Sequence, residues 1–230
     1  MSRKALFSKR RRRVAALGAA GLGACAVLAA CSPVQVGAAA IVGNQRITAS
    51  SLDTQVSNWQ TAAKPYNGLQ LTSANAPSAV LSWLIRFAVM DQVATANGIS
   101  VTDAQSQAGL SSLSAVAAQN GASSTAQLLI ANGISPQMFP LVGRYEAQQD
   151  AFARKGNNGQ EPTSTAAQNA FTAAFNKAQC TAEKSLNIQV SPQFGRLDYT
   201  QLMVVPAADT LSKPDPLPSP ASTTGLAPAC

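Results

Sequence analysis

The carboxylates are the side chains in this sequence that could perform acid–base chemistry. The chain has no histidine, which excludes Ser-His-Asp and Cys-His catalysis, histidine-containing zinc sites and the usual proton shuttle near neutral pH. Paired Asp and Glu side chains can still act as acid and base, and Glu146 and Asp150 stand four positions apart. Exposed charges are common on helix surfaces, so a solvated helix face explains this pair better. We predict no catalytic residue, no metal site and no cofactor, and thus no enzymatic activity.

Two of the four cysteines are candidates for a disulfide bond. Cys180 and Cys230 could pair in an oxidising compartment. Closing a loop of about 50 residues would stabilise the fold by roughly 4 kcal/mol in the chain-entropy model. Two unpaired thiols remain the alternative, because Cys230 ends a Pro- and Ser-rich segment.

A third cysteine, Cys31, ends an apolar run that follows a basic block. The uncharged stretch 14–30 comes directly after Arg10–Arg13. It is shorter than the roughly 20 apolar residues of a membrane span, and the basic head and small residues before Cys31 are typical of a secretory signal. An uncleaved anchor helix remains the alternative. Either interpretation places the rest of the chain outside the cytoplasmic membrane, with Sec and twin-arginine export both open.

The net charge argues against a nucleic-acid partner. The formal charge is +7, but seven of the seventeen cationic residues lie in the first thirteen positions. The remaining chain carries ten cationic and ten acidic residues. A neutral body lacks the long-range field that attracts phosphates, so we predict no DNA or RNA binding.

The chain is long enough for one domain with a real core. We expect a signal peptide over 1–30, a tether over 31–40 and a helical domain over 41–198. The segment 199–230 is rich in Pro and Ser with few large apolar residues, which is typical of a flexible tail.

The first elements are predicted to be a hairpin and two helices. Gly43-Asn44 stands between short β-favouring pairs and suits a tight turn. Thr48 can cap a helix that ends before Pro65. A second helix from Pro77 to residue 96 is apolar around most of its circumference, which indicates either burial on several sides or an open apolar groove.

Later helices are predicted from their start and stop signals. Asn-Gly-Ile-Ser occurs at 97–100 and at 132–135 and indicates a glycine-containing helix end. Capping-box spacings predict three helix starts, at Thr102 with Gln105, Ser124 with Gln127, and Thr165 with Gln168. A short strand is expected over Leu186–Val190, where apolar and polar residues alternate. Ser135-Pro136 predicts another start, although Pro140 should break or kink its first turn.

Three short motifs resemble known families. Leu28-Ala29-Ala30-Cys31 resembles the lipobox of bacterial lipoproteins, which implies a diacylglycerol on the Cys31 thiol and cleavage before it; Leu22–Cys25 fits more loosely. The segments Ala40–Thr48 and Val190–Asp198 resemble the start and end of actinobacterial lipoproteins with a SurA N-terminal-like domain, related to the chaperone modules of SurA and PrsA.

The likeness to these lipoproteins covers about 38–198 and departs from the family pattern in detail. Gly43-Asn44 inverts the usual Asn-Gly order, and substitutions occur at Ser191, Gln193 and Leu197. The resemblance implies a mainly α, multi-helix fold with a small β element made by the N-terminal hairpin and a C-terminal strand. It also implies an extracytoplasmic, membrane-anchored module that binds unfolded or exported polypeptides.

SurA- and PrsA-like proteins insert a parvulin isomerase domain before the last helix. The corresponding gap here is only 155–163, and even small domains need about 50 residues, so we expect the isomerase to be missing. The alternatives are an accessory subunit of a cell-envelope complex, a degenerate prolyl isomerase and a carboxylate hydrolase.

Large aromatic residues are candidates for holding apolar client segments, which gain about 25 cal/mol per Å² of apolar area removed from water. Ordinary core packing is the alternative for each of them. The candidates are Trp59, Trp83, Phe87, Phe139, Tyr145 and Phe152.

Overall fold

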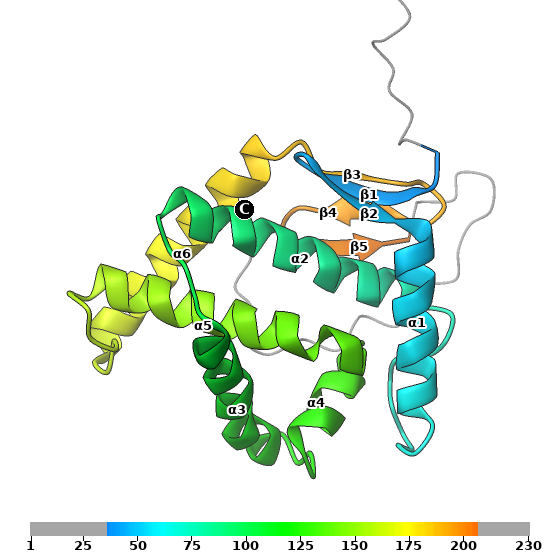
Figure 1. Cartoon of the computed structure of the whole chain (residues 1–230), viewed down its shortest axis with the longest axis horizontal. Coiled ribbons are helices and arrows are strands. Elements are labelled where there is room, and N and C mark those ends of the chain that lie inside the picture. The colour runs from blue at the N-terminus through cyan, green and yellow to red at the C-terminus, as the bar shows by residue number, and fades with distance from the viewer. Residues whose placement is uncertain (1–35, 207–230) are drawn as a thin grey trace, which may run out of the picture. The chain divides into compact units, whose positions relative to one another are not determined.

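A computed structural model describes residues 36–206. The predicted signal peptide, Cys31, Cys230 and most of the predicted tail lie outside these residues. The described part is mainly helical, as expected, and its strands gather on one side of the long helix α2 (Ala76–Ala96) (Figure 1).

The first sheet joins the two ends of the described chain. Strands β1 (Ala38–Val42) and β2 (Gln45–Thr48) form the predicted hairpin, and Gly43 has a φ of +60° at its turn. Strand β3 (Gln189–Val190) pairs antiparallel with β1, so the strand order is β2-β1-β3. The small β element therefore combines the N-terminal hairpin with a C-terminal strand, as predicted.

Two boundaries of the predicted domain need correction. Ala38–Ala40 were assigned to the tether, but they lie in β1 and are buried. At the other end, β4 (Arg196–Asp198) and β5 (Met203–Val205) form an antiparallel hairpin. Residues 199–205 are therefore folded, contrary to the prediction that a flexible tail begins at 199. Leu202 and Val204 are the apolar residues that bury this segment.

The first two helices begin and end where the sequence indicates. Helix α1 (Ala49–Ala63) is capped by Thr48, whose hydroxyl accepts a hydrogen bond from Ser51 N. Its buried stripe consists of Leu52, Val56 and Trp59. Helix α2 has Pro77 in its first turn and ends in the predicted motif, where Ile99 N donates to the Ala94 carbonyl.

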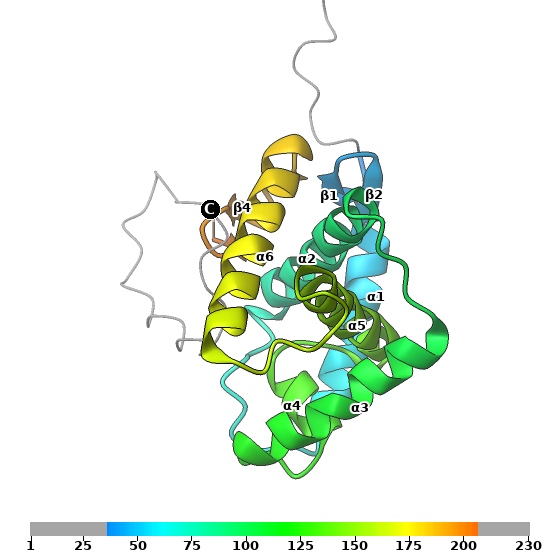
Figure 2. The same ribbon diagram turned by 90° about the vertical axis from the view of Figure 1, so that its left-hand side faces the viewer.

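Helix α2 is the centre of the core. It packs against α1, the strands, and two later helices, α5 (Phe139–Gly156) and α6 (Thr165–Ser185). Among the described helices, only α2 is long and apolar enough to suit a membrane span, but most of that window is buried inside the fold. Its all-round apolar pattern thus reflects burial on several sides, the first of the two predicted outcomes (Figures 1 and 2).

Polar side chains join α2 to α5. The Asp91 carboxylate accepts a hydrogen bond from the buried Gln148 amide at 2.8 Å and forms a 3.0 Å ion pair with Arg144. The Lys155 ammonium donates to the carbonyl of Asn97, at the end of α2. These contacts fix the register of the two helices.

Three caps of the later helices differ from the prediction, and one of them is Ser135, which precedes the short helix η1 (Pro136–Met138) without making a side-chain cap hydrogen bond. Helix α3 (Asp103–Gln119) begins with a complete capping box of Thr102 and Gln105. At α4 (Thr125–Ala131), Ser124 caps Gln127 N, but the Gln127 side chain accepts from Ser123 instead of completing the box. The last predicted cap is one residue off, because Ser164 and not Thr165 caps α6.

The two prolines near α5 are accommodated by a broken first turn. Pro136 begins a short 3-10 helix, η1 (Pro136–Met138), and Pro140 then occupies the first turn of α5. A proline there removes no hydrogen bond, since the first N–H groups of a helix have no internal partner. The predicted break at Pro140 is confirmed.

Candidate functional site

Helices α3 and α5 touch through their backbones. A Cβ added to Gly109 would lie 2.5 Å from the Gly143 carbonyl oxygen, and one added to Gly143 would lie 2.2 Å from the Ser106 carbonyl oxygen. Both distances are shorter than carbon–oxygen contacts allow. Glycine at both positions is therefore what permits this approach.

A cleft of about 1030 Å³ lies beside this contact and is open to solvent. Its walls are α3, α5, the connector 157–164 and the start of α6. Several lining residues are small, among them Ala108, Gly109, Ala147 and Ala151. Phe171 is the large apolar side chain among them. Small side chains leave the cleft wide and bring the helix backbones close to whatever occupies it.

The charged groups at one end of the cleft are already paired. The Arg154 guanidinium lies 2.9 Å from an Asp150 oxygen and 2.5 Å from a Glu161 oxygen, and all three residues line the cleft. They are exposed, so each ion pair contributes little to stability. Their effect is to leave this trio with one net negative charge.

Glu146 lines the same cleft without a partner. It is half-buried, and within residues 36–206 no hydrogen bond or ion pair reaches its carboxylate. Burial raises the pKa of Glu146 to about 7. The predicted solvated face is therefore correct for Asp150 and wrong for Glu146, because α3 packs against the α5 turn that carries Glu146.

Amide side chains give the cleft its hydrogen-bonding capacity. Gln105, Gln149 and Gln168 line it from α3, α5 and α6. The Gln105 oxygen accepts from Thr102 in the capping box, which leaves its NH₂ group available to donate. An amide offers both donors and an acceptor, so these groups can bond to any peptide main chain without reading its sequence.

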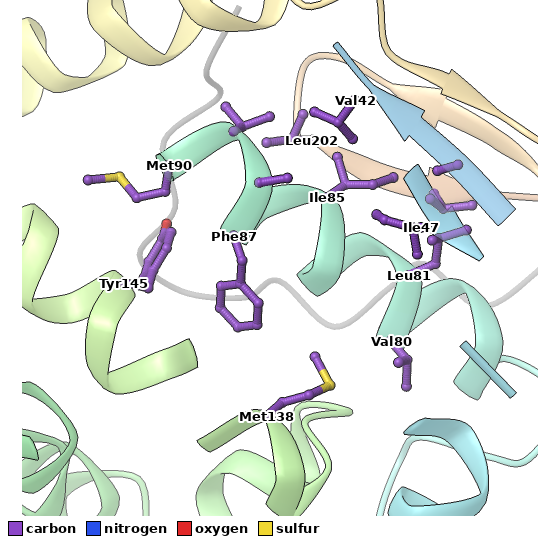
Figure 3. Packing of buried hydrophobic residues seen from close by; sticks show 14 of the residues in the cluster. Val42, Ile47, Val80, Leu81, Ile85, Phe87, Met90, Met138, Tyr145 and Leu202 are labelled. Atoms are coloured by element: carbon purple, nitrogen blue, oxygen red, sulfur yellow. The ribbon is translucent and has the colours of Figure 1, made fainter. Parts of the chain in front are cut away.

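Three of the six aromatic candidates meet in the core. Ring centroids are 5.8 Å apart for Trp83 and Phe87, 6.5 Å for Trp83 and Tyr145, and 5.8 Å for Phe87 and Tyr145. Phe87 and Tyr145 are buried, and Trp83 is half-buried with its indole N–H donating to the Asn132 carbonyl. Figure 3 shows Tyr145 of α5 beside Phe87 and Met90 of α2.

The other three candidates lie elsewhere. Trp59 is 3% exposed, donates its indole N–H to the Ile130 carbonyl at 2.7 Å and borders a smaller hollow of about 370 Å³. Phe152 packs on Phe171 and Phe175 of α6, and Phe139 is half-buried against the core. The six do not form one surface, and client contact by any of them stays a prediction.

Of the three cysteines with a predicted role, only Cys180 lies within the described residues. Cys180, on α6, is disulfide-bonded. The predicted partner Cys230 and the predicted lipidation site Cys31 lie outside residues 36–206, so the pairing and the lipid stay predictions. Among the described residues, no group of three or more Cys, Asp and Glu side chains could hold a metal ion.

A family model described as the SurA-like N-terminal domain matches residues 14–155. The chain belongs to this family. The match spans α1 to α5, and so includes both helices whose glycines meet beside the cleft. A SurA-like N-terminal domain is a non-catalytic, chaperone-type module. No curated protein matches the chain.

The sequence indicated this cleft only in fragments. The sequence places Glu146 and Asp150 four positions apart and predicts Gln105 and Gln168 in capping boxes. The signal for the helix contact is weaker, because it consists only of Gly109 and Gly143, each an isolated glycine within a helical pattern. The arrangement of the four walls depends on contacts between segments that are separate in the chain.

Proposed function

We propose that this chain is an extracytoplasmic, membrane-anchored, non-catalytic module that binds unfolded or exported polypeptides. The family match over 14–155 carries the proposal. The basic block and lipobox-like Leu28–Cys31 support the anchored location.

The cleft supports polypeptide binding in its size and its lining. Its volume of about 1030 Å³ is at the upper end of the roughly 300–1,000 Å³ of small-molecule pockets, and it is open to solvent rather than enclosed. Such a space suits a segment of a longer chain. Amide groups from three helices can bond to main-chain N–H and C=O groups, which all client sequences share.

A substitution on α3 and a matched control at the neighbouring position test this site. Ser112 lines the cleft, whereas Ser111 does not, and both are exposed with their hydroxyls bonded to carbonyls of α3. Ser112→Trp should fill the cleft and weaken binding about tenfold, while Ser111→Trp should leave it unchanged. The measurement is suppression of aggregation of a chemically denatured protein by the full-length chain in non-ionic detergent.

The same preparations separate the alternatives. Prolyl isomerisation without aggregation suppression would overturn the proposal in favour of a degenerate isomerase. Inactivity in both assays would favour an accessory subunit with one fixed partner. Suppression that Ser112→Trp leaves intact would place client binding on another surface.

A further inference from the structure

The charged groups that line the cleft are unbalanced. Its lining includes three carboxylates, those of Glu146, Asp150 and Glu161, but one guanidinium, that of Arg154. Asp150 and Glu161 share this guanidinium. Glu146 therefore faces the cleft as an acidic group for which the described structure supplies no counter-charge.

We propose that the cleft prefers extended polypeptide segments carrying a lysine or arginine, whose cation pairs with the Glu146 carboxylate. The inference rests on the proposed function and names the class of client. Gln105, Gln149 and Gln168 then bond to the main chain on either side of the basic residue.

A basic peptide fits this lining better than an apolar one. Apart from Phe171 and Pro162, the apolar lining consists of small residues such as Ala108 and Ala151, which form no pocket for one large apolar side chain and so select no particular apolar client. A cation brought to Glu146 forms a charge-assisted hydrogen bond in a site shielded by α3, where the bond is stronger than at an open surface.

A metal ion is a poorer occupant of the same site. Within the described residues no three acidic side chains gather closely enough to ligate one. The extended amine of lysine or the guanidinium of arginine can instead reach a single carboxylate from a main chain held by the amides.

Labelled peptides test the preference directly. Three ten-residue peptides of Gly, Ser and Asn would differ only at one central residue, which is Lys, Gln or Glu. Their dissociation constants would be measured by fluorescence anisotropy with the full-length chain in non-ionic detergent, at about pH 8.5, where Glu146 is ionised, and at about 0.15 M salt, where long-range attraction is screened. We expect the Lys peptide to bind about five- to tenfold tighter than the Gln peptide, and the Glu peptide to bind most weakly.

Two variants that each remove one negative charge locate the effect. Glu146→Gln keeps the shape of the side chain and should equalise the Lys and Gln peptides without weakening the Gln peptide. Asp53→Asn, an exposed position on α1 away from the cleft, should keep the full preference. Thermal unfolding of both variants checks that each is folded.

The outcomes distinguish this inference from the function on which it rests. Equal binding of the three peptides would overturn the charge preference and leave polypeptide binding standing. A preference that persists in Glu146→Gln would also overturn it, because the charge would then act elsewhere. If none of the peptides binds and denatured protein is not protected either, the proposed function itself fails.

Discussion

The side of the β4–β5 hairpin and the side of the cleft differ in how their polar groups are satisfied. On the side of the β4–β5 hairpin, Arg86 is only 7% exposed, yet its guanidinium donates to the carbonyls of Leu202 and Gln201 and lies 5.0 Å from the centre of the Trp83 ring. One turn earlier, the Ser82 hydroxyl accepts from Val204 N. Every one of these groups finds its partner within the chain.

On the side of the cleft, the polar groups are half-buried or exposed, and solvent in the open cleft reaches them. Glu146 is half-buried and unpaired, and the glutamine amides retain bonding capacity. Water can satisfy these groups in the open cleft, and the same bonding capacity is available to a bound peptide, as the proposed function requires. The comparison separates a side that closes the fold from a side that is suited to receive another molecule.

The contact between α3 and α5 should be the most sensitive point of the cleft side. Gly143→Ala places a methyl group against the Ser106 carbonyl and forces α3 away. Overpacking of this kind costs about 1–3 kcal/mol, so we expect the free energy of unfolding to fall by about 2–3 kcal/mol in urea titrations. Polypeptide binding should fall with it.

Gly156→Ala is the matched control, since Gly156 ends the same helix and a Cβ there meets nothing within 4 Å. It should be neutral or stabilise by up to about 1 kcal/mol. Equal stability of the two variants would mean that α3 is free to shift, and the cleft would then have no fixed shape.

The closed side should respond to loss of its internal partners. Arg86→Met keeps the apolar stem but leaves the Leu202 and Gln201 carbonyls without their donors. Unsatisfied buried acceptors cost about 1–3 kcal/mol, and we expect about 2 kcal/mol, measured by urea unfolding. Hydrogen exchange should rise first in β4 and β5.

Arg144→Met provides the comparison for this loss. Its guanidinium is half-exposed and pairs with Asp91 at 3.0 Å, so its removal should cost less than about 1 kcal/mol. If both variants lose the same stability, Arg86 does not hold the hairpin, and the contrast between the two sides is weakened.

Local signals in the sequence predicted most of the helices. Thr48, Thr102 and the two Asn-Gly-Ile-Ser motifs act within a few residues, and the structure places helix ends at each of them. One error is also local. At α6, the adjacent hydroxyl residues Ser164 and Thr165 could each supply the cap, and the spacing to Gln168 favours Thr165, whereas the structure uses Ser164.

Features that depend on distant contacts were not predictable in this way. The segment 199–205 appears tail-like because its neighbours are Pro-rich, and it is ordered by Arg86 and Ser82 from 115 or more residues earlier. Leu202, in a left-handed conformation with φ +48°, is held there by the same contact. Glu146 is similar, because only the packing of α3 takes it out of water.

The smallest expected effect per residue concerns pH and two glutamates, Glu146 and Glu183, whose carboxylates make no hydrogen bond or ion pair in the described structure. Glu183 on α6 is buried with neither oxygen hydrogen-bonded, and burial raises its pKa to about 7, as it does for Glu146. A folded-state pKa above the unfolded value of about 4.3 favours folding at low pH, and this stabilisation is lost as pH rises through 7. We expect the free energy of unfolding to fall by roughly 1–2 kcal/mol per residue between pH 5 and 8.5, after allowance for solvent screening.

The charges around both groups set the size of this effect. Asp150, Arg154 and Glu161 share the cleft with Glu146, while Lys184 lowers the pKa of Glu183. The pKa of Asp198 is lowered by its hydrogen bonds to Thr200, so it titrates below this range. Urea unfolding across the range should become nearly flat in Glu146→Gln/Glu183→Gln, with each single variant intermediate. If the free energy of unfolding of the double variant still falls with pH, other groups cause the dependence. If Glu183→Gln alone removes the dependence, the Glu146 carboxylate is solvated, and water in the open cleft occupies the position that we assign to a bound cation.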